Sequence, residues 1–198
     1  MELIPAEQLP AFREETKRQA EANFARVNSK IDLNKYTAKF HRIAGLNITA
    51  KAKTLQMWEL GTEISKAVTP FSACKQGCSY CCNIAATITT TEARIIGKYV
   101  GRKPLVLTKR VDIFGNIPKY SGTPCPFLKQ GRCSIYEVRP LACRIHFNLA
   151  DSPYFCNTAI PSKESYVPQL DNDSIDVAHF KAFSQEIWAD MRDFFPPK

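Results

Sequence analysis

Cysteines are the residues with the clearest chemical meaning in this chain, which has 198 residues and 8 cysteines. Four of them fall in the nine-residue run Cys74-Lys75-Gln76-Gly77-Cys78-Ser79-Tyr80-Cys81-Cys82. The other four are Cys125, Cys133, Cys143 and Cys156, and the first 73 residues contain none. A cysteine thiolate is a soft, anionic ligand for zinc and for iron–sulfur clusters. Clustering at this density predicts that these thiolates bind metal.

The spacing inside the first run suggests how the sulfurs are shared. Cys78 and Cys81 are separated by two residues, as are paired ligands in zinc knuckles and iron–sulfur loops. Gly77 lets the backbone come close to a metal, and Cys74 can add a third sulfur. Cys81 and Cys82 are adjacent, so their side chains diverge and we expect them to serve different centres. The eight cysteines could fill two four-thiolate sites. Alternatively, one 4Fe–4S cluster is bound and the remaining thiols are structural or reactive.

The second group of cysteines begins at Cys125-Pro126-Phe127-Leu128. Proline and aromatic residues stiffen the connection to Cys133, which would keep the ligands preorganised. Cys143 lies near the start of a short helix predicted after Pro140, where the helix dipole favours a thiolate. Basic residues beside the cysteines would also stabilise thiolates. They are Lys75, Arg132, Arg139 and Arg144.

The other polar residues near the cysteines carry weaker signals. His146 could be a nitrogen ligand or an acid/base group, but a single histidine in an apolar stretch is more often packed and hydrogen bonded. His41 and His179 lie away from the cysteines in the sequence. Glu137 and Arg139 fit structural partners better than catalysts.

The distribution of charge favours a local electrostatic role over nucleic-acid binding. The net charge is +8, and residues 71–150 carry 12 basic and 3 acidic side chains, so the basic excess coincides with the cysteines. Four thiolates around a divalent ion have a net charge of −2, which offsets part of this excess. No known nucleic-acid-binding module occurs in the sequence, so we do not expect a nucleic-acid partner, although basic patches attract nucleic acid.

The redox state of the thiols depends on the compartment. No apolar run approaches the roughly 20 residues that span a bilayer, and the charged N-terminus does not resemble a signal peptide. We therefore expect a cytoplasmic protein without a membrane partner. Its thiols would stay reduced and available for metal, rather than form disulfides.

Helical periodicity predicts the elements that must position the cysteines. Residues Leu9 to Val27 repeat apolar positions at three- and four-residue steps, with Phe24 on the inner face. A break around residues 28–34 precedes a second helix from about Asn47 to Val68. Thr89 and Glu92 form a predicted capping box for a short helix that Gly101 ends.

The remaining predictions concern short elements and the C-terminus. Residues 105–107 and 111–114 read as β-like stretches, with turns predicted at residues 115–116 and 121–122. The tripeptide Lys129-Gln130-Gly131 predicts a tight turn between two short strands. Residues 157–173 should be a loop. A last helix is predicted from about Ser174 to Phe195, with Phe180 on its inner side.

Part of the first run matches the S-adenosylmethionine radical-enzyme pattern. Cys74-x3-Cys78-x2-Cys81 includes the aromatic Tyr80 before the last cysteine. That fold needs about six βα units of roughly 30 residues each. Only 116 residues follow Cys82, and they lack alternating strands and helices. The match therefore indicates the capacity to hold a 4Fe–4S cluster, rather than that fold.

A second resemblance covers more of the chain, roughly residues 72–146. The first cysteine run, Cys125-Pro-Phe-Leu, Cys133-Ser-Ile-Tyr-Glu, Arg139-Pro and Cys143-Arg144 together resemble the CxxCxxCC cysteine-cluster family, also called the YkgJ family. The first spacing has three residues where the family name has two. The resemblance implies zinc or iron chelation in a cytosolic protein and says little about a reaction. Flagellin lysine methylases look similar around the cysteines, which keeps an enzymatic accessory role in view.

We therefore predict a mainly α fold: a small helical domain with irregular metal-stapled loops and at most a short β-hairpin. Residues 1–70 should form a helical segment packed on the core, 71–160 the metal-binding domain, and 161–198 a loop and helix completing that domain. The predicted function is thiolate chelation of zinc or an iron–sulfur cluster, in a structural or partner-binding module with a protein partner. The alternative is an iron–sulfur-dependent enzyme or an accessory factor for a methylation-like or redox reaction. The sequence does not decide whether the chain is an enzyme, and it contains no nucleotide-binding loop or acid/base pair.

Overall fold

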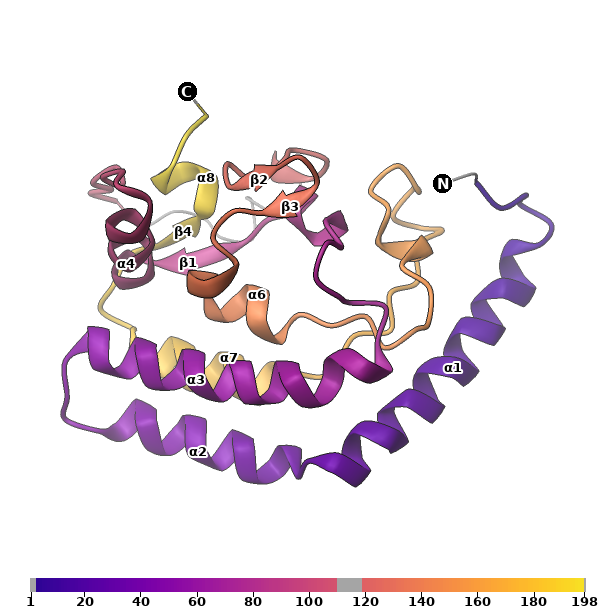
Figure 1. Cartoon of the computed structure of the whole chain (residues 1–198), viewed down its shortest axis with the longest axis horizontal. Helices are drawn as coiled ribbons and strands as arrows, with labels where there is room; N and C mark the ends of the chain where they lie inside the picture. The colour runs from indigo at the N-terminus through magenta and orange to yellow at the C-terminus, as the bar shows by residue number, and fades with distance from the viewer. Residues whose placement is uncertain (1–2, 110–118, 198) are drawn as a thin grey trace.

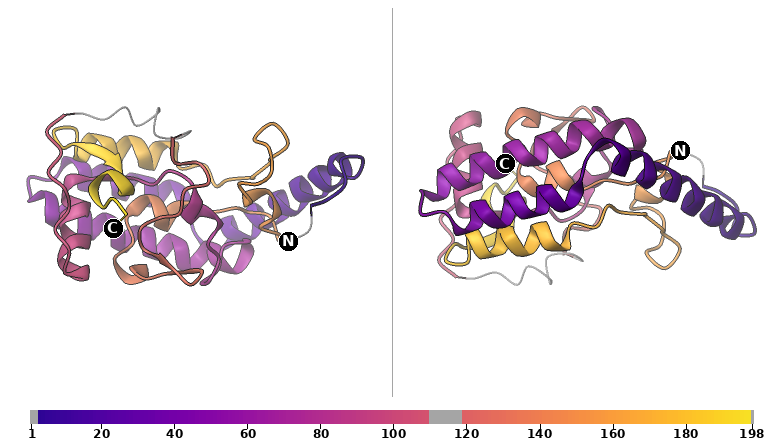
Figure 2. Two further views of the ribbon diagram at one scale, coloured as in Figure 1. Left: turned by 90° about the horizontal axis from the view of Figure 1, so that it is seen from above. Right: turned by 90° about the horizontal axis from the view of Figure 1, so that it is seen from below.

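A computed structural model describes residues 3–109 and 119–197 of the chain. Its largest part is a layer of helices (Figure 1). The helices α2, α3 and α7 lie side by side in this layer, and α1 extends beyond them along the long axis (Figure 2). Their bounds are α1 Leu9–Lys30, α2 Leu33–Gly45, α3 Ala50–Val68 and α7 Asp173–Ala182.

Local sequence signals account for where these helices start. Asp32 caps α2 by accepting hydrogen bonds from the backbone N–H groups of Asn34 and Lys35. Thr49 caps α3 through its hydroxyl oxygen. Such caps satisfy backbone donors that the first helical turn leaves unpaired.

A second, less regular layer carries the cysteines above the helices (Figure 1). Apart from α4, its α-helices are only four or five residues long. Its strands form two antiparallel pairs, β1 with β4 and β2 with β3. The bounds are β1 Thr87–Thr89, α4 Thr90–Val100, β2 Leu128–Lys129, β3 Arg132–Cys133, α6 Leu141–Ile145, β4 Trp188–Asp190 and α8 Met191–Phe194. Four 3-10 turns connect them: η1 Thr69–Phe71, η2 Tyr80–Asn83, η3 Tyr136–Val138 and η4 Tyr154–Cys156.

The two layers share an apolar core, and a buried carboxylate joins them. Glu92 is fully buried and accepts hydrogen bonds from Trp58 Nε1 of α3, at 2.9 Å, and from the backbone N–H of Leu141 in α6, at 2.9 Å. Its second oxygen accepts the N–H of Thr89, completing a capping box. Helix α3 also approaches α6 closely at Gly61, where an added Cβ would lie 2.9 Å from Leu141. These contacts fix α6, which carries Cys143.

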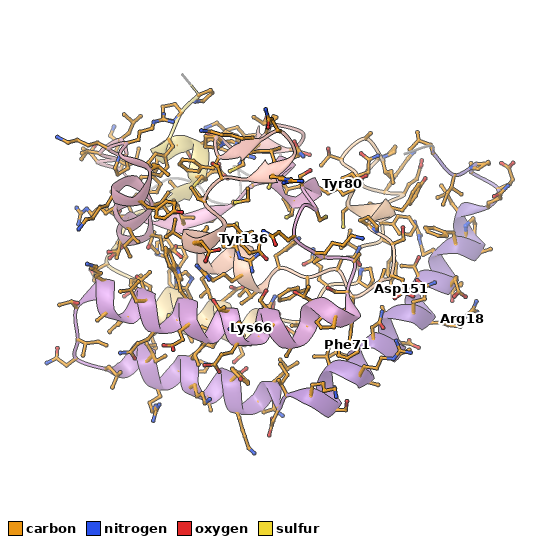
Figure 3. All side chains as sticks on the ribbon, in the orientation of Figure 1. Arg18, Lys66, Phe71, Tyr80, Tyr136 and Asp151 are labelled. Atoms are coloured by element: carbon orange, nitrogen blue, oxygen red, sulfur yellow. The ribbon has the colours of Figure 1, made fainter. Side chains whose placement is uncertain are left out.

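A separate apolar cluster attaches the start of α1 to the loop that carries Cys156. Phe12 packs edge-on against Tyr154, with ring centroids 5.3 Å apart, and also contacts Phe155. Further along α1, Asn23 donates hydrogen bonds to Leu149 O and to Asp151 Oδ1. Figure 3 shows Asp151 at this junction. Helix α1 therefore supports residues 149–156.

Several predicted elements are confirmed. The fold is mainly helical, and α1 and α3 occupy the predicted ranges. The Thr89 capping box begins α4 and the left-handed Gly101 cap ends it, as expected. The turn at Gln130 and Gly131, both with positive φ, joins β2 and β3. The predicted loop at 157–173 has no regular element beyond one isolated bridge at Gln169 and the first residue of α7.

Other predictions are wrong. The C-terminal helix from Ser174 to Phe195 is broken into α7, β4 and α8, because Trp188–Asp190 pairs with β1 a hundred positions earlier and Asp190 caps a new helix. Phe180 is therefore exposed, as is Phe24 of α1, where Asn23 is buried instead. Helix α2 lies where no helix was predicted.

The predicted β-like stretches have two different outcomes. Residues 105–107 are not in a strand, and Leu105 donates its N–H to Phe194 O at 2.8 Å. The stretch 111–114 and the turn at 115–116 lie outside the described residues. In the part of the chain that is described, no helix is both long and apolar enough to cross a membrane.

Candidate metal centre

The fold brings the eight cysteines together from five segments of the irregular layer. All eight are unpaired thiols. Cys74 and Cys78 lie between η1 and η2, Cys81 and Cys82 lie in η2, and Cys125 precedes β2. Cys133 ends β3, Cys143 lies in α6, and Cys156 ends η4.

A cavity of about 500 Å³ lies at the centre of this arrangement, and every cysteine except Cys156 lines it. Tyr136 from η3 and His146 also line this cavity, and Tyr136 is labelled above α3 in Figure 3. We call it the inner cavity. Cysteines from position 74 to position 143 thus line one cavity.

A second cavity of about 600 Å³, which we call the outer cavity, contains Cys156. Its other cysteines are Cys74, Cys78 and Cys81, which also line the inner cavity. Together with Ile84 and His146, these three residues line both cavities. Tyr80, at the opposite end of η2 from Asn83, lines the outer cavity (Figure 3).

Backbone N–H groups point at several of the sulfurs. The N–H of Tyr80 donates to Cys78, that of Phe127 donates to Cys125, and that of Ile135 donates to Cys133. In each case the donor lies two residues after the cysteine. Gly77, with φ of 95°, and the turn from Lys75 to Cys78 shape the first of these loops. Hydrogen bonds of this kind favour the thiolate form that binds metal.

Asn148 supplies a further contact to two sulfurs at once. Its backbone N–H donates to Cys74 Sγ at 3.2 Å, and its side-chain Nδ2 donates to Cys156 Sγ at 3.2 Å. Asn148 is buried, and its carbonyl accepts the N–H of Ala73. One residue therefore ties together two cysteines that are 82 positions apart in the chain.

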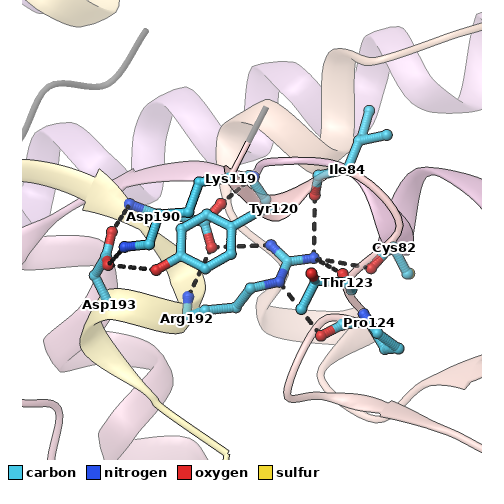
Figure 4. A network of polar contacts seen from close by, with 10 residues as sticks. Cys82, Ile84, Lys119, Tyr120, Thr123, Pro124, Asp190, Arg192 and Asp193 are labelled. Atoms are coloured by element: carbon cyan, nitrogen blue, oxygen red, sulfur yellow. Dashed lines mark hydrogen bonds and ion pairs between the residues drawn. The ribbon is translucent and has the colours of Figure 1, made fainter. Parts of the chain in front are cut away.

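Arg192 plays a corresponding part for the segments that carry Cys82 and Cys125 (Figure 4). Its buried guanidinium pairs with Asp190 Oδ1 at 2.9 Å and donates to the carbonyls of Cys82, Ile84, Thr123 and Pro124. The N–H of Cys125 donates directly to Cys82 O at 2.7 Å. The η2 turn and the segment that carries Cys125 are therefore joined independently of their thiols.

Burial keeps most of the thiols protonated. It raises the pKa of Cys74 to about 12, and those of Cys125 and Cys156 to about 11, although N–H donors act in the opposite direction. Burial also raises the pKa of Cys143 well above the ordinary value. Such thiols are neutral at pH 7 until a metal displaces their protons.

The adjacent pair Cys81 and Cys82 differs from the rest. A hydrogen bond from the Cys82 thiol lowers the pKa of Cys81 to about 7, while the same bond, followed by burial, raises the pKa of Cys82. Cys81 is also the one exposed residue among the eight cysteines. Cys81 is therefore the thiol that is most readily ionised and reached from solvent.

Three of the four predicted basic residues line the inner cavity: Lys75, Arg132 and Arg139. Arg139 also stacks on the Tyr136 ring and donates to Ser65 Oγ. Arg144 has a different role, because its guanidinium donates to Thr62 Oγ1 and to two backbone carbonyls. It holds the turn before α6 in place.

Of the three histidines, only His146 lies at the cavities, as the sequence indicated. His146 lines both cavities, and burial lowers its pKa, so the ring is neutral at pH 7. His179 is buried against the rings of Phe183 and Trp188. His41 is hydrogen bonded to Ser174 Oγ in the helical layer.

The donor set fits a soft metal. No Asp or Glu of the described residues lines either cavity, which disfavours the oxygen-rich shells of magnesium and calcium. Sulfur and one neutral imidazole are ligands typical of zinc and iron–sulfur clusters. Among the described residues, no three His, Cys, Asp or Glu side chains already surround one point at ligand distance. Ligation therefore requires the thiols to move closer together than they lie in this structure.

Sequence reasoning missed the two residues that organise the cysteines. Asn148 and Arg192 lie outside the cysteine motifs, and nothing in the local sequence of either one indicates contact with a sulfur or with a cysteine carbonyl. Only the fold, which pairs segments far apart in the chain, brings them to the site.

Comparison with known proteins supports the chemistry of this segment. Residues 73–165 match the model of the family CxxCxxCC, described as "Putative zinc- or iron-chelating domain". No curated protein and no solved structure matches the chain. The matched residues contain the cysteine run, the β2–β3 hairpin, α6 and Cys156, and thus all eight thiols. Over residues 73–165, the chain is thus similar to the CxxCxxCC family.

Proposed function

We propose that this protein binds zinc or an iron–sulfur cluster through its cysteine thiolates, and that the metal holds the irregular layer in a shape that a protein partner recognises. The observation that carries the proposal is the inner cavity, which seven cysteines from four segments of the chain line together. Eight reduced thiols supply the soft donors that both kinds of centre require.

The irregular layer also has the character of a segment that metal stabilises. Its strands are two or three residues long, and its 3-10 turns have three or four residues. Small or irregular segments of this kind commonly depend on structural metal for part of their folding free energy. A structural role thus accounts for the combination of short elements and many thiols.

One observation favours a second candidate, an iron–sulfur-dependent enzyme or an accessory factor for a modification reaction. The inner cavity has room for more than an ion, and Arg139 Nε is buried there without a hydrogen-bond partner among the described residues. A guanidinium so placed could bind an anionic substrate or cofactor group. The exposed Cys81 would leave a coordination position accessible.

Anaerobic purification tests the main proposal. We expect metal to co-purify with the protein, and the visible spectrum together with counts of iron, sulfide and zinc identifies it. A brown protein with iron and sulfide in near-stoichiometric amounts supports the cluster, and a colourless one with zinc supports zinc. Protein that contains neither metal and has its thiols paired as disulfides would refute the proposal.

Titration with S-adenosylmethionine separates the two candidate functions. A structural module should not bind this cofactor, whereas an enzyme of the radical or methyl-transfer kind should bind it with a saturable heat of binding. The substitution Arg139→Met is the matched variant, because it removes the buried guanidinium but no thiol. Binding that is lost in this variant would favour the enzymatic candidate.

A further inference from the structure

Resting on the proposed function, we infer that the eight cysteines form two separate four-thiolate centres rather than one. Centre A consists of Cys74, Cys78, Cys81 and Cys156, and Asn148 positions it. Centre B consists of Cys82, Cys125, Cys133 and Cys143, and Arg192 positions it.

The contacts of Cys156 define centre A. Cys156 lines the outer cavity, together with Cys74, Cys78 and Cys81, and does not line the inner one. Asn148 donates one hydrogen bond to its sulfur and another to that of Cys74, each at 3.2 Å. Two sulfurs that accept hydrogen bonds from one residue face the same space, so Cys74 and Cys156 belong to one centre.

The contacts of Cys82 define centre B. Its carbonyl accepts the N–H of Cys125 at 2.7 Å, and Arg192 donates to the same carbonyl. The β2–β3 hairpin places Cys133 opposite Leu128, three residues after Cys125. Cys143 approaches from α6, whose position Glu92 fixes. These four cysteines line the inner cavity and are absent from the outer one.

Cys81 is assigned to a centre by the number of sulfurs that each centre already has. It lines both cavities, and its thiol is hydrogen bonded to that of Cys82. Centre B already has four sulfurs without it, and centre A has three. A four-thiolate shell in each centre therefore places Cys81 in centre A, and the peptide bond between Cys81 and Cys82 links the two centres.

Positive charge is available to each centre. Lys75 acts on Cys78 of centre A, and Arg192 acts on Cys125 of centre B. Arg139 acts on both centres, through Cys81 and Cys133. Two four-thiolate sites filled by divalent ions would together carry a charge of about −4. The basic residues offset part of this charge at both places, as two adjacent anionic centres require.

Single substitutions at one cysteine of each centre test the inference. The variants are Cys156→Ser for centre A, Cys133→Ser for centre B, and the double variant. Each is purified without oxygen beside the wild type, and zinc, iron and sulfide are counted per chain. Ser174→Ala, in the helical layer away from the cysteines, is the control. Far-UV circular dichroism confirms that each chain is folded.

Two independent centres predict additive losses. Each single variant should keep about half of the wild-type metal, the double variant should keep none, and the control should equal the wild type. The inference is overturned if either single variant loses all of its metal, if only one of the two has an effect, or if the double variant equals a single one. These expectations hold both for zinc and for iron–sulfur clusters, and the sulfide count distinguishes zinc from a cluster.

Cobalt titration of the metal-free proteins gives a second reading that does not depend on what co-purifies. The thiolate-to-cobalt absorption should saturate at two equivalents in the wild type and at one in each single variant. Saturation of the wild type at one equivalent overturns two centres while leaving metal binding intact. A wild type that binds neither cobalt nor its native metal refutes the proposed function itself.

Discussion

At the scale of single residues, two opposing effects act on the protonation of the thiols. Burial favours the neutral form, as the raised pKa of Cys74 and Cys125 shows, while N–H donors such as those of Asn148 and Phe127 favour the thiolate. A group with this balance stays protonated and inert until a cation arrives. The donors then hold the sulfur in its ligating orientation, as outer-shell partners of metal ligands do.

Removing the side chain of Asn148 tests this view. Asn148→Ala deletes the hydrogen bond from Nδ2 to Cys156 Sγ but keeps the backbone donor to Cys74. We expect the affinity of one centre for zinc to fall by about 10- to 100-fold, as is common for outer-shell substitutions. A competition titration with a chromophoric chelator measures it. Asn172→Ala, which removes a hydrogen bond to Ile145 O, is the matched control. Equal affinity in both variants would argue against the role of Asn148.

We expect the stability of the metal-free protein and the affinity for zinc to change with pH in opposite directions. Because burial raises the pKa of Cys125 and Cys156 to about 11, the unfolded chain ionises first, at about pH 8.5. The metal-free protein should therefore lose stability as the pH rises above about 8.5. Metal binding releases protons, so the apparent zinc affinity should instead increase from pH 6 to pH 8, by more than about tenfold per pH unit.

Two titrations check these signs. Urea unfolding of the metal-free protein between pH 7 and pH 10 gives the first, and chelator competition between pH 6 and pH 8 gives the second. A zinc affinity that does not change with pH would show that protonated thiols are not the ligands.

At the scale of elements, Arg192 connects the C-terminal segment to the cysteine loops. It links α8 to η2 and to the segment before β2, and its partner Asp190 is fully buried. Arg192→Met leaves that carboxylate without its cation, and we expect a loss of about 3–5 kcal/mol in the free energy of unfolding. Urea denaturation measures the loss. Arg18→Met, on the exposed face of α1 (Figure 3), should leave the urea midpoint unchanged.

The elements that could be predicted are those with local signals. The range of α1, the Thr89 capping box and the positive-φ turn at Gly131 depend on neighbours within a few residues, and all three were predicted. Helix α2 carries such signals as well, in its Asp32 cap and its buried Phe40 and Ile43, and was nevertheless missed.

Elements that depend on distant partners could not be predicted. The segment Trp188–Asp190 has helical periodicity, but its pairing with Thr87–Thr89 determines its structure. The same holds for the candidate site. The cysteines are visible in the sequence as candidate ligands, whereas the proposed grouping rests on Asn148 and Arg192, whose contacts reach across 74 and 110 positions.

At the scale of the whole molecule, a regular helical layer supports an irregular layer that carries the thiols (Figure 1). Helices α2, α3 and α7 have buried apolar residues of their own, such as Phe40, Met57 and Ala178. The cysteine loops lack comparable regular structure. Metal should therefore contribute more to the order of the second layer than to that of the first.

Removal of the metal should lower stability without abolishing the helices. A ligand present at about 1,000 times its Kd stabilises the native state by about 4 kcal/mol. For a chain of this size, that corresponds to a fall in Tm of about 8–16 °C on chelation. Thermal scans by circular dichroism, with and without a chelator, measure the shift, and the helical signal at 20 °C should largely remain. Thermal transitions that coincide with and without the chelator would show that no metal stabilises the fold.

The central claim is that sulfur binds the metal, and X-ray absorption at the metal edge tests it most directly. In protein loaded with zinc, the account predicts four sulfur neighbours per metal at about 2.3 Å. In protein loaded with iron and sulfide, it predicts an all-sulfur shell with iron neighbours beyond it. A first shell of oxygen and nitrogen at about 2.0–2.2 Å would contradict the account, because the metal would then lie outside the cysteine cluster.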